Sequence, residues 1–223
     1  MTKLYPLALV LLLLISCNEE TDKKPLSAPE KIAYAHGFEN WDKIEEIQFT
    51  FNVDRDTTHF ERHWIWQPKS DAVTMIYAED TVSYNRASID STVLQADKAF
   101  VNDVYWLLAP YKLVWDKGYE YEEPYLDKAP ISNDSLQKFS IVYVGEGGYT
   151  PGDGYDFYLD QENKVKEWVY RKDNDTAVCM KTTWEDYENL EGLQIATMHQ
   201  DETGKFKLYF TGLEVTASET QTP

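Results

Sequence analysis

Histidine and carboxylate side chains alternate between His59 and His63, and this pattern could bind a metal ion. Alternate residues of a strand share one face about 6.6 to 7 Å apart, so His59 and Glu61, or Glu61 and His63, could share an ion. The two histidines lie about 13 Å apart and could not both bind it. A zinc site would need ligands from a neighbouring strand, and the sequence reveals none. We expect a polar outer face here and no metal site.

Carboxylates and tyrosines alternate between residues 119 and 127, as they do in sugar-binding clefts. Glycoside hydrolysis requires two carboxylates at a fixed separation across a cleft, which spacing along a chain does not fix. We interpret the segment as a solvated acidic loop and keep a carbohydrate-binding or carbohydrate-processing protein as an alternative function. The residues concerned are Tyr119, Tyr121, Tyr125, Glu120, Glu122, Glu123 and Asp127.

The most glycine-rich segment, 145–154, does not fit a phosphate or calcium loop. It lacks the Gly-Lys-Ser/Thr ending of a P-loop and precedes a strand, not a helix. Its Asp153, with Asp156 and Asp160, does not have the spacing of a calcium loop. The four histidines lie in no recognised nucleophile motif. We expect a long hairpin or rim loop here, and a chain without catalytic residues, resident metal or cofactor.

The first seventeen residues read as an export and lipidation signal. Lys3 precedes nine apolar residues, Leu7 to Ile15, and this run is too short to cross a bilayer, which takes about twenty helical residues. It leads into Leu14-Ile15-Ser16-Cys17, which looks like the lipobox of bacterial lipoproteins. We expect residues 1–16 to be a signal peptide and Cys17 to be acylated, because acyl chains give stable membrane anchoring without a transmembrane segment.

The polar and proline-bearing residues 17–29 are typical of a flexible tether. Their acidic start is similar to the signal that places some lipoproteins on the outer face of the Gram-negative outer membrane. We therefore expect an outer-membrane lipoprotein, either periplasmic or surface-exposed. Cys179 would be the only other thiol, so an intramolecular disulfide is excluded. Its apolar, strand-like surroundings predict a buried structural cysteine.

Composition limits the partners and the fold. The chain has 39 acidic and 21 basic residues and a net charge of −18. A basic surface that could bind nucleic acid is therefore not expected. Hydrophobic residues make up 43% of the chain and aromatic residues 14%, which indicates a folded protein with a sizeable core. We expect one domain over residues 30–217, a disordered tail over 218–223, and a monomer.

Hydrophobic periodicity predicts mainly β structure (α+β) with two helices. Helical spacing runs from Glu30 to about Trp41, and again over 97–109, where Pro110 should end the helix. The expected roughly nine to eleven antiparallel strands would form a large curled sheet or a half-open β-barrel. Alternation marks strands near 47–53, 60–66, 72–77, 81–84, 138–144, 155–159, 164–170, 178–184, 193–198 and 205–215.

This order of elements carries a family resemblance. An N-terminal helix precedes a strand meander containing Phe49-Thr50-Phe51 and Trp64-Ile65-Trp66, and the central helix contains the segment Tyr105 to Tyr111. The pattern resembles the LolA/LolB-type superfamily of envelope lipoprotein carriers and sensors. The resemblance implies an unclosed β-barrel, capped by helices, over an apolar cavity. It also implies a lipid or lipoprotein acyl chain as the ligand, although the carrier of that superfamily is not lipidated.

Large aromatic side chains could line such a cavity or fill a packed core. As a set, we predict that they bind a hydrophobic ligand. The favoured function is a non-enzymatic lipoprotein that binds a lipid or acyl chain; the alternatives are the carbohydrate protein above or an interaction scaffold without a small ligand. The candidate cavity residues are Phe49, Phe51, Trp64, Trp66, Phe100, Trp106, Trp115, Trp168 and Trp184.

Overall fold

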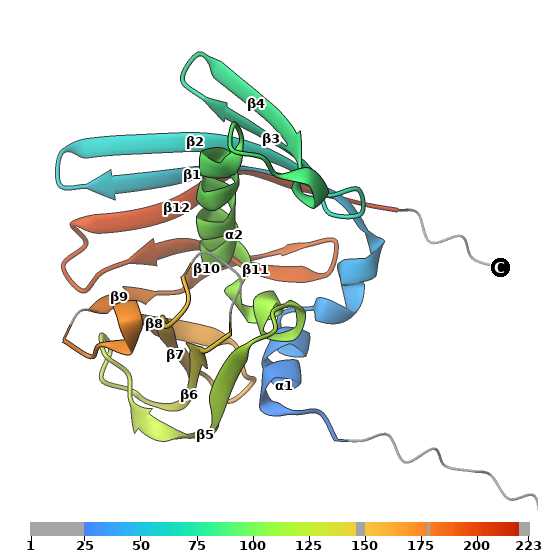
Figure 1. The fold of residues 1–223 in the computed structure, drawn as a ribbon. Coiled ribbons are helices and arrows are strands. Elements are labelled where there is room, and N and C mark those ends of the chain that lie inside the picture. The colour runs from blue at the N-terminus through green and yellow to red at the C-terminus, as the bar shows by residue number, and fades with distance from the viewer. Residues whose placement is uncertain (1–24, 146–149, 178, 219–223) are drawn as a thin grey trace, which may run out of the picture.

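The computed structural model describes residues 25–145, 150–177 and 179–218. Two antiparallel sheets and a long central helix make up this part of the chain (Figure 1). The seven-stranded sheet, here the large sheet, has the order β10-β11-β12-β1-β2-β3-β4, and the five-stranded small sheet has the order β5-β6-β7-β8-β9. The predicted α+β class, with a large antiparallel sheet that does not close into a barrel, is confirmed. The signal peptide, Cys17 and the first part of the tether lie outside the described residues.

The described residues contain twelve strands, two α-helices and three short 3₁₀ helices. The large sheet contains β1 (Ile44–Arg55), β2 (Thr58–Gln67), β3 (Ala72–Tyr77), β4 (Asp80–Asn85), β10 (Glu185–Leu190), β11 (Leu193–Gln200) and β12 (Phe206–Ala217). The small sheet contains β5 (Tyr119–Lys128), β6 (Ser135–Tyr143), β7 (Gly154–Leu159), β8 (Val165–Arg171) and β9 (Cys179–Thr183). The helices are α1 (Ala28–Ala35), α2 (Leu94–Trp115), η1 (Phe38–Lys43), η2 (Arg86–Ser88) and η3 (Lys172–Asn174).

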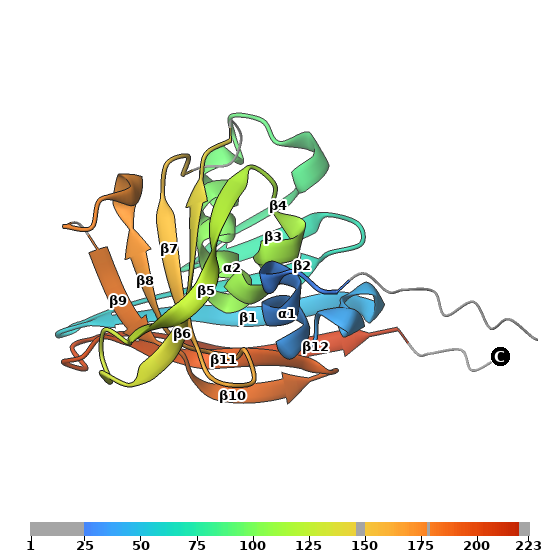
Figure 2. The same ribbon diagram turned by 90° about the horizontal axis from the view of Figure 1, so that it is seen from below.

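Helix α2 crosses the inner face of the large sheet (Figure 1), and the small sheet stands beside it (Figure 2). Phe100 and Leu108 of α2 belong to a core built with the large sheet. Tyr105 and Ala109 belong to a second core built with the small sheet. Because side chains from several sides of one helix enter two cores, α2 is the element that joins the sheets.

Helix α2 continues beyond the position at which the sequence predicts its end. Pro110 lies inside the helix, which ends at Trp115, and the disturbance is confined to Leu108, whose φ and ψ are −132° and 26°. Pro110 is buried in the helix, together with Tyr111 and Leu113. A proline removes one helical hydrogen bond and kinks the helix. The packing of the last turn overrides that local cost, and the prediction that Pro110 ends the helix is wrong.

Helix α1 is shorter than the sequence predicts. Ser27 caps its start, where its backbone N–H donates to the Glu30 carboxylate at 2.7 Å. The helix stops at Ala35 because Gly37 adopts a left-handed conformation, with φ +87°. The 3₁₀ helix η1 then covers the remaining residues to Lys43.

The acidic stretch interpreted as a loop is strand β5, which pairs with β6 along most of its length. The predicted strand over 178–184 corresponds to β9, which ends at Thr183; after Trp184 the chain enters the large sheet as β10, which was not predicted. The Trp184 N–H donates to the Lys166 carbonyl at 2.8 Å. This junction is the second link between the sheets.

Cys179 is exposed, so the prediction of a buried cysteine is wrong. It begins β9, an edge strand whose exposed positions alternate with inward-facing ones. The apolar neighbours on either side therefore did not indicate its orientation.

No helix in residues 25–145, 150–177 or 179–218 has both the length and the apolar character needed to cross a membrane.

Candidate functional site

A pocket of about 250 Å³ lies between the first half of α2 and the inner face of the small sheet. We call it the aromatic pocket. Rings form most of its wall, and among the described residues Lys98 supplies its one charged side chain. It is lined by Lys98, Val101, Asn102, Tyr105 and Trp106 of α2, by Thr150, and by Tyr155, Trp168, Tyr170 and Met180 of β7 to β9.

The spacing of the lining residues along β8 and α2 places them on one face of each element. Trp168 and Tyr170 alternate on β8 and therefore share its inner face. Lys98, Val101, Asn102 and Tyr105 recur at helical spacing on α2. The ring centroids of Trp106 and Trp168 are 4.6 Å apart, and those of Tyr105 and Tyr155 are also 4.6 Å apart. These contacts form a continuous aromatic wall from the helix to the sheet.

The tyrosine hydroxyls of the pocket are neutral. Burial raises the pKa of Tyr105 and Tyr155 well above that of free tyrosine, and raises that of Tyr170 to about 12. The Tyr170 hydroxyl donates to Asp153 at 2.9 Å. Apolar walls with a few oriented polar groups are typical of small-molecule sites.

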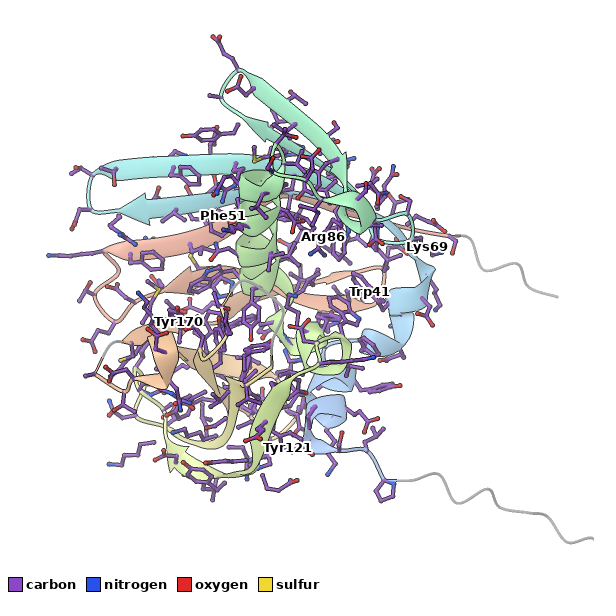
Figure 3. The ribbon with its side chains drawn as sticks, in the orientation of Figure 1. Trp41, Phe51, Lys69, Arg86, Tyr121 and Tyr170 are labelled. Atoms are coloured by element: carbon purple, nitrogen blue, oxygen red, sulfur yellow. The ribbon has the colours of Figure 1, made fainter. Side chains whose placement is uncertain are left out.

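A second pocket, of about 210 Å³, lies on the other side of α2. Figure 3 shows Trp41 and Arg86 on this side and Tyr170 on the side of the aromatic pocket. Burial lowers the pKa of Lys112, and Asp116, 3.4 Å away, opposes that shift. Arg86 is paired with the buried Asp97 at 2.8 Å. The lining comprises Trp41, Trp66, Arg86, Phe100, Val101, Val104, Lys112, Trp115 and Asp116.

The structure distributes the nine predicted cavity residues over three environments. Trp106 and Trp168 line the aromatic pocket. Trp66, Phe100 and Trp115 line the second pocket. The other four are packed in the cores, with side chains that line neither pocket: Phe49, Phe51, Trp64 and Trp184.

Sequence reasoning did not single out several residues of the aromatic pocket. Tyr105 and Asn102 lie on the helix that carries Trp106, at positions that the periodicity of that helix could have indicated. Tyr155, Tyr170 and Met180 come from strands that were predicted. Their contact with α2 depends on how the small sheet packs against that helix, which no local sequence pattern indicates.

The other chemical candidates are surface features. His59 lies 2.7 Å from Asp54 and 3.4 Å from Glu61, whereas His63 lies 3.2 Å from Thr50. Nowhere in the described part of the chain are three His, Cys, Asp or Glu side chains placed to hold one metal ion. The carboxylates Glu120, Glu122 and Glu123 of β5 are exposed. The glycine-rich segment lies partly outside the described residues, because 146–149 are not included.

No family model and no curated protein matches the sequence. Among solved structures, a DUF1329 family protein from Desulfovibrio piger has a TM-score of 0.49 at 10% identity, with 90% of this chain and 96% of that chain covered. A LolA superfamily protein from Nitrosomonas europaea has a TM-score of 0.49 at 8% identity, over 87% of this chain and 96% of that one. An outer membrane lipoprotein-sorting protein domain from Vibrio parahaemolyticus has a TM-score of 0.42 at 10% identity, over 87% and 96%.

These likenesses are of fold alone, and all three TM-scores are below 0.5.

Proposed function

We propose that this chain is an outer-membrane lipoprotein of a Gram-negative bacterium that binds a hydrophobic ligand, a lipid or an acyl chain, without catalysing a reaction. The aromatic pocket is the observation that supports this function. Five of its described lining residues are aromatic, Val101 and Met180 are apolar, Asn102 and Thr150 are polar, and Lys98 carries the only charge among them. Such a surface recognises a ligand by burial of apolar area, which is non-directional.

The size of the pocket favours one extended chain over a bulky ligand. At about 250 Å³ it lies just below the range of about 300 to 1,000 Å³ that is usual for ligand sites. Each buried methylene contributes about 0.8 kcal/mol. Affinity should therefore rise with chain length until the pocket is full.

Anchoring through acylated Cys17 is the second part of the proposal. The folded body begins at the Ser27 cap of α1, so the polar residues from 18 onward would separate it from the membrane. A monomer that binds its ligand within one chain is sufficient for this function. A carbohydrate function is less well supported, because Glu120, Glu122 and Glu123 of β5 are exposed and do not line the aromatic pocket.

Native mass spectrometry of residues 18–223, purified without detergent from a bacterial host, tests the proposal. This chain contains every described residue. Met180→Lys puts a charge in the pocket wall, and Lys181→Met is the matched control, because Lys181 is the next residue of β9 and is exposed. We expect the wild type and Lys181→Met to carry lipid or fatty acid that organic extraction releases, and Met180→Lys to lose it.

A clean unliganded mass for the wild type, with no uptake of added fatty acid, would contradict the proposed function.

A further inference from the structure

Within the described residues, four buried polar atoms without a hydrogen-bond partner gather beyond the inner wall of the aromatic pocket. They are Nε1 of Trp168, Nε1 of Trp184, Oγ1 of Thr182 and Nε2 of His199. All four residues are at most 1% exposed. Buried polar groups in folded proteins are nearly always hydrogen-bonded, so a cluster of exceptions indicates a missing partner.

The four residues are neighbours. The ring centroids of Trp168 and Trp184 are 5.4 Å apart, and those of Trp184 and His199 are 4.6 Å apart. Thr182 lies opposite Trp168 in the β8–β9 pairing and two residues before Trp184. We call this group the polar floor.

The polar floor is continuous with the aromatic pocket. Trp168 belongs to both. Met180, which lines the pocket, lies two residues before Thr182 and therefore on the same face of β9. The ring of Trp106, also in the pocket wall, lies 4.6 Å from that of Trp168 and 5.5 Å from that of His199. The polar floor therefore lies directly behind the part of the pocket wall that Trp106 and Trp168 form.

The polar floor offers both donors and acceptors. The two indole nitrogens can only donate, and the Thr182 hydroxyl can do either. Nδ1 of His199 lies 3.1 Å from the Thr183 carbonyl, and the ring also faces the Trp106 carbonyl; both carbonyls can only accept, so the neutral ring donates to one of them. Burial lowers the pKa of His199 to about 3, so the ring is neutral at physiological pH.

Pro110 adds another acceptor. A proline has no N–H, so the carbonyl of Trp106, four residues earlier, lacks its usual helical donor. This carbonyl lies near enough to His199 to raise the pKa of that ring against the larger effect of burial. The polar floor, as defined by its four described residues, therefore contains several hydrogen-bonding groups and no charged side chain.

We propose that the polar floor is the terminal subsite of the aromatic pocket and receives a neutral hydroxyl group at the end of an apolar chain. This inference rests on the proposed function. A hydroxyl accepts from an indole N–H and donates to the Thr182 hydroxyl oxygen, so it pairs two of the orphaned groups at once. A carboxylate or an ammonium group would be buried there without an opposite charge, at a large desolvation cost.

Binding of decane, 1-decanol and decanoate to residues 18–223 at pH 7.5, measured by displacement of a fluorescent apolar probe, tests the inference. We expect 1-decanol to bind about tenfold more tightly than decane, because two net hydrogen bonds are gained. Decanoate should bind more weakly than 1-decanol.

Thr182→Val removes one hydroxyl from the polar floor at nearly constant shape. It should reduce the advantage of 1-decanol over decane about threefold or more and leave the affinity for decane unchanged. Thr74→Val is the matched control, because Thr74 lies on β3 and its hydroxyl bonds to Ser83 at 2.9 Å; it should change neither affinity.

Equal affinities for decane and 1-decanol would mean that the polar floor holds an ordered water only, which overturns the inference and leaves the proposed function standing. Failure of all three compounds to bind would overturn both.

Discussion

At the scale of single residues, buried charges attach α2 to the large sheet. Asp103 is fully buried and accepts from Nε and Nη2 of Arg62, each at 2.9 Å, and from Nε1 of Trp64 at 2.8 Å. Arg62 and Trp64 alternate on β2 and therefore share a face. Their common acceptor lies on an element far along the chain, and local spacing contains no information about such a pairing.

The same limit applies to the candidate site. Large aromatic residues were recognisable as a set, and Trp106 and Trp168 do line the aromatic pocket. Phe49 and Trp64 have the same residue types and the same alternation, yet they fill the core. Residue type predicts burial, whereas the choice between a cavity wall and a core depends on how two sheets pack about one helix.

His36 gives the folding stability a pH dependence that can be tested. Its ring is buried, Nδ1 donates to the Ile32 carbonyl at 2.8 Å, and burial lowers its pKa from 6.5 to about 4. On acidification from about pH 6.5 to 4 the unfolded chain takes up a proton that the folded ring does not. The contribution of His36 to the free energy of unfolding is therefore complete above pH 6.5. About 1.4 kcal/mol of it is lost per pH unit as the pH falls from 6.5 toward 4.

We expect His36→Gln to flatten the loss of unfolding free energy between pH 6.5 and 5, measured by urea titration. His59→Gln is the contrasting variant, because Asp54 raises the pKa of His59 and its contribution is lost as the pH rises. Its contribution is fully present below pH 6.5, so that variant should leave the loss between pH 6.5 and 5 nearly unchanged. An unchanged slope in His36→Gln would show that the ring is accessible to protons in the folded state.

At the scale of elements, the sequence predicts the strands that carry buried apolar residues. β1, β2, β7 and β8 were recognised from their alternating apolar residues. β5 and β10 were not, because both consist largely of acidic and polar residues that are exposed or half-buried. Pairing to a neighbouring strand holds them, and their own side chains contribute little to a hydrophobic pattern.

Gly37 follows α1 and lies against the turn between β10 and β11, so substitution of Gly37 tests this close contact. A Cβ at this residue would lie 2.0 Å from the Gly192 carbonyl oxygen, in addition to the strain of φ +87°. Gly212 also has a positive φ, +55°, but no described atom lies within 4 Å of the place that its Cβ would take. We expect Gly212→Ala to cost about 1 to 2 kcal/mol from backbone strain alone, and Gly37→Ala to cost clearly more, as measured by urea unfolding.

If the two alanine variants lose the same free energy, the close approach of α1 to the turn between β10 and β11 is wrong.

At the scale of the whole molecule, two hydrophobic cores share one helix. Phe49 lies in the core of the large sheet and Phe157 in that of the small sheet, and both are fully buried. α2 contributes to both cores, and the β9–β10 junction at Trp184 joins the sheets covalently. Neither sheet can lose its core without exposing one side of α2, so the two should unfold together.

We therefore expect Phe49→Leu and Phe157→Leu to destabilise the same single transition, each by about 1 to 3 kcal/mol. Tryptophan fluorescence reports mainly on side-chain packing and far-ultraviolet circular dichroism on the backbone. The urea transitions followed by the two signals should coincide in the wild type and in both variants. A Phe157→Leu chain in which part of the circular dichroism signal is lost at low urea, while the remainder keeps the wild-type midpoint, would mean that the small sheet unfolds independently. In that case α2 would depend on the large sheet alone, and the aromatic pocket could open by melting of its β-sheet wall while the large sheet remained folded.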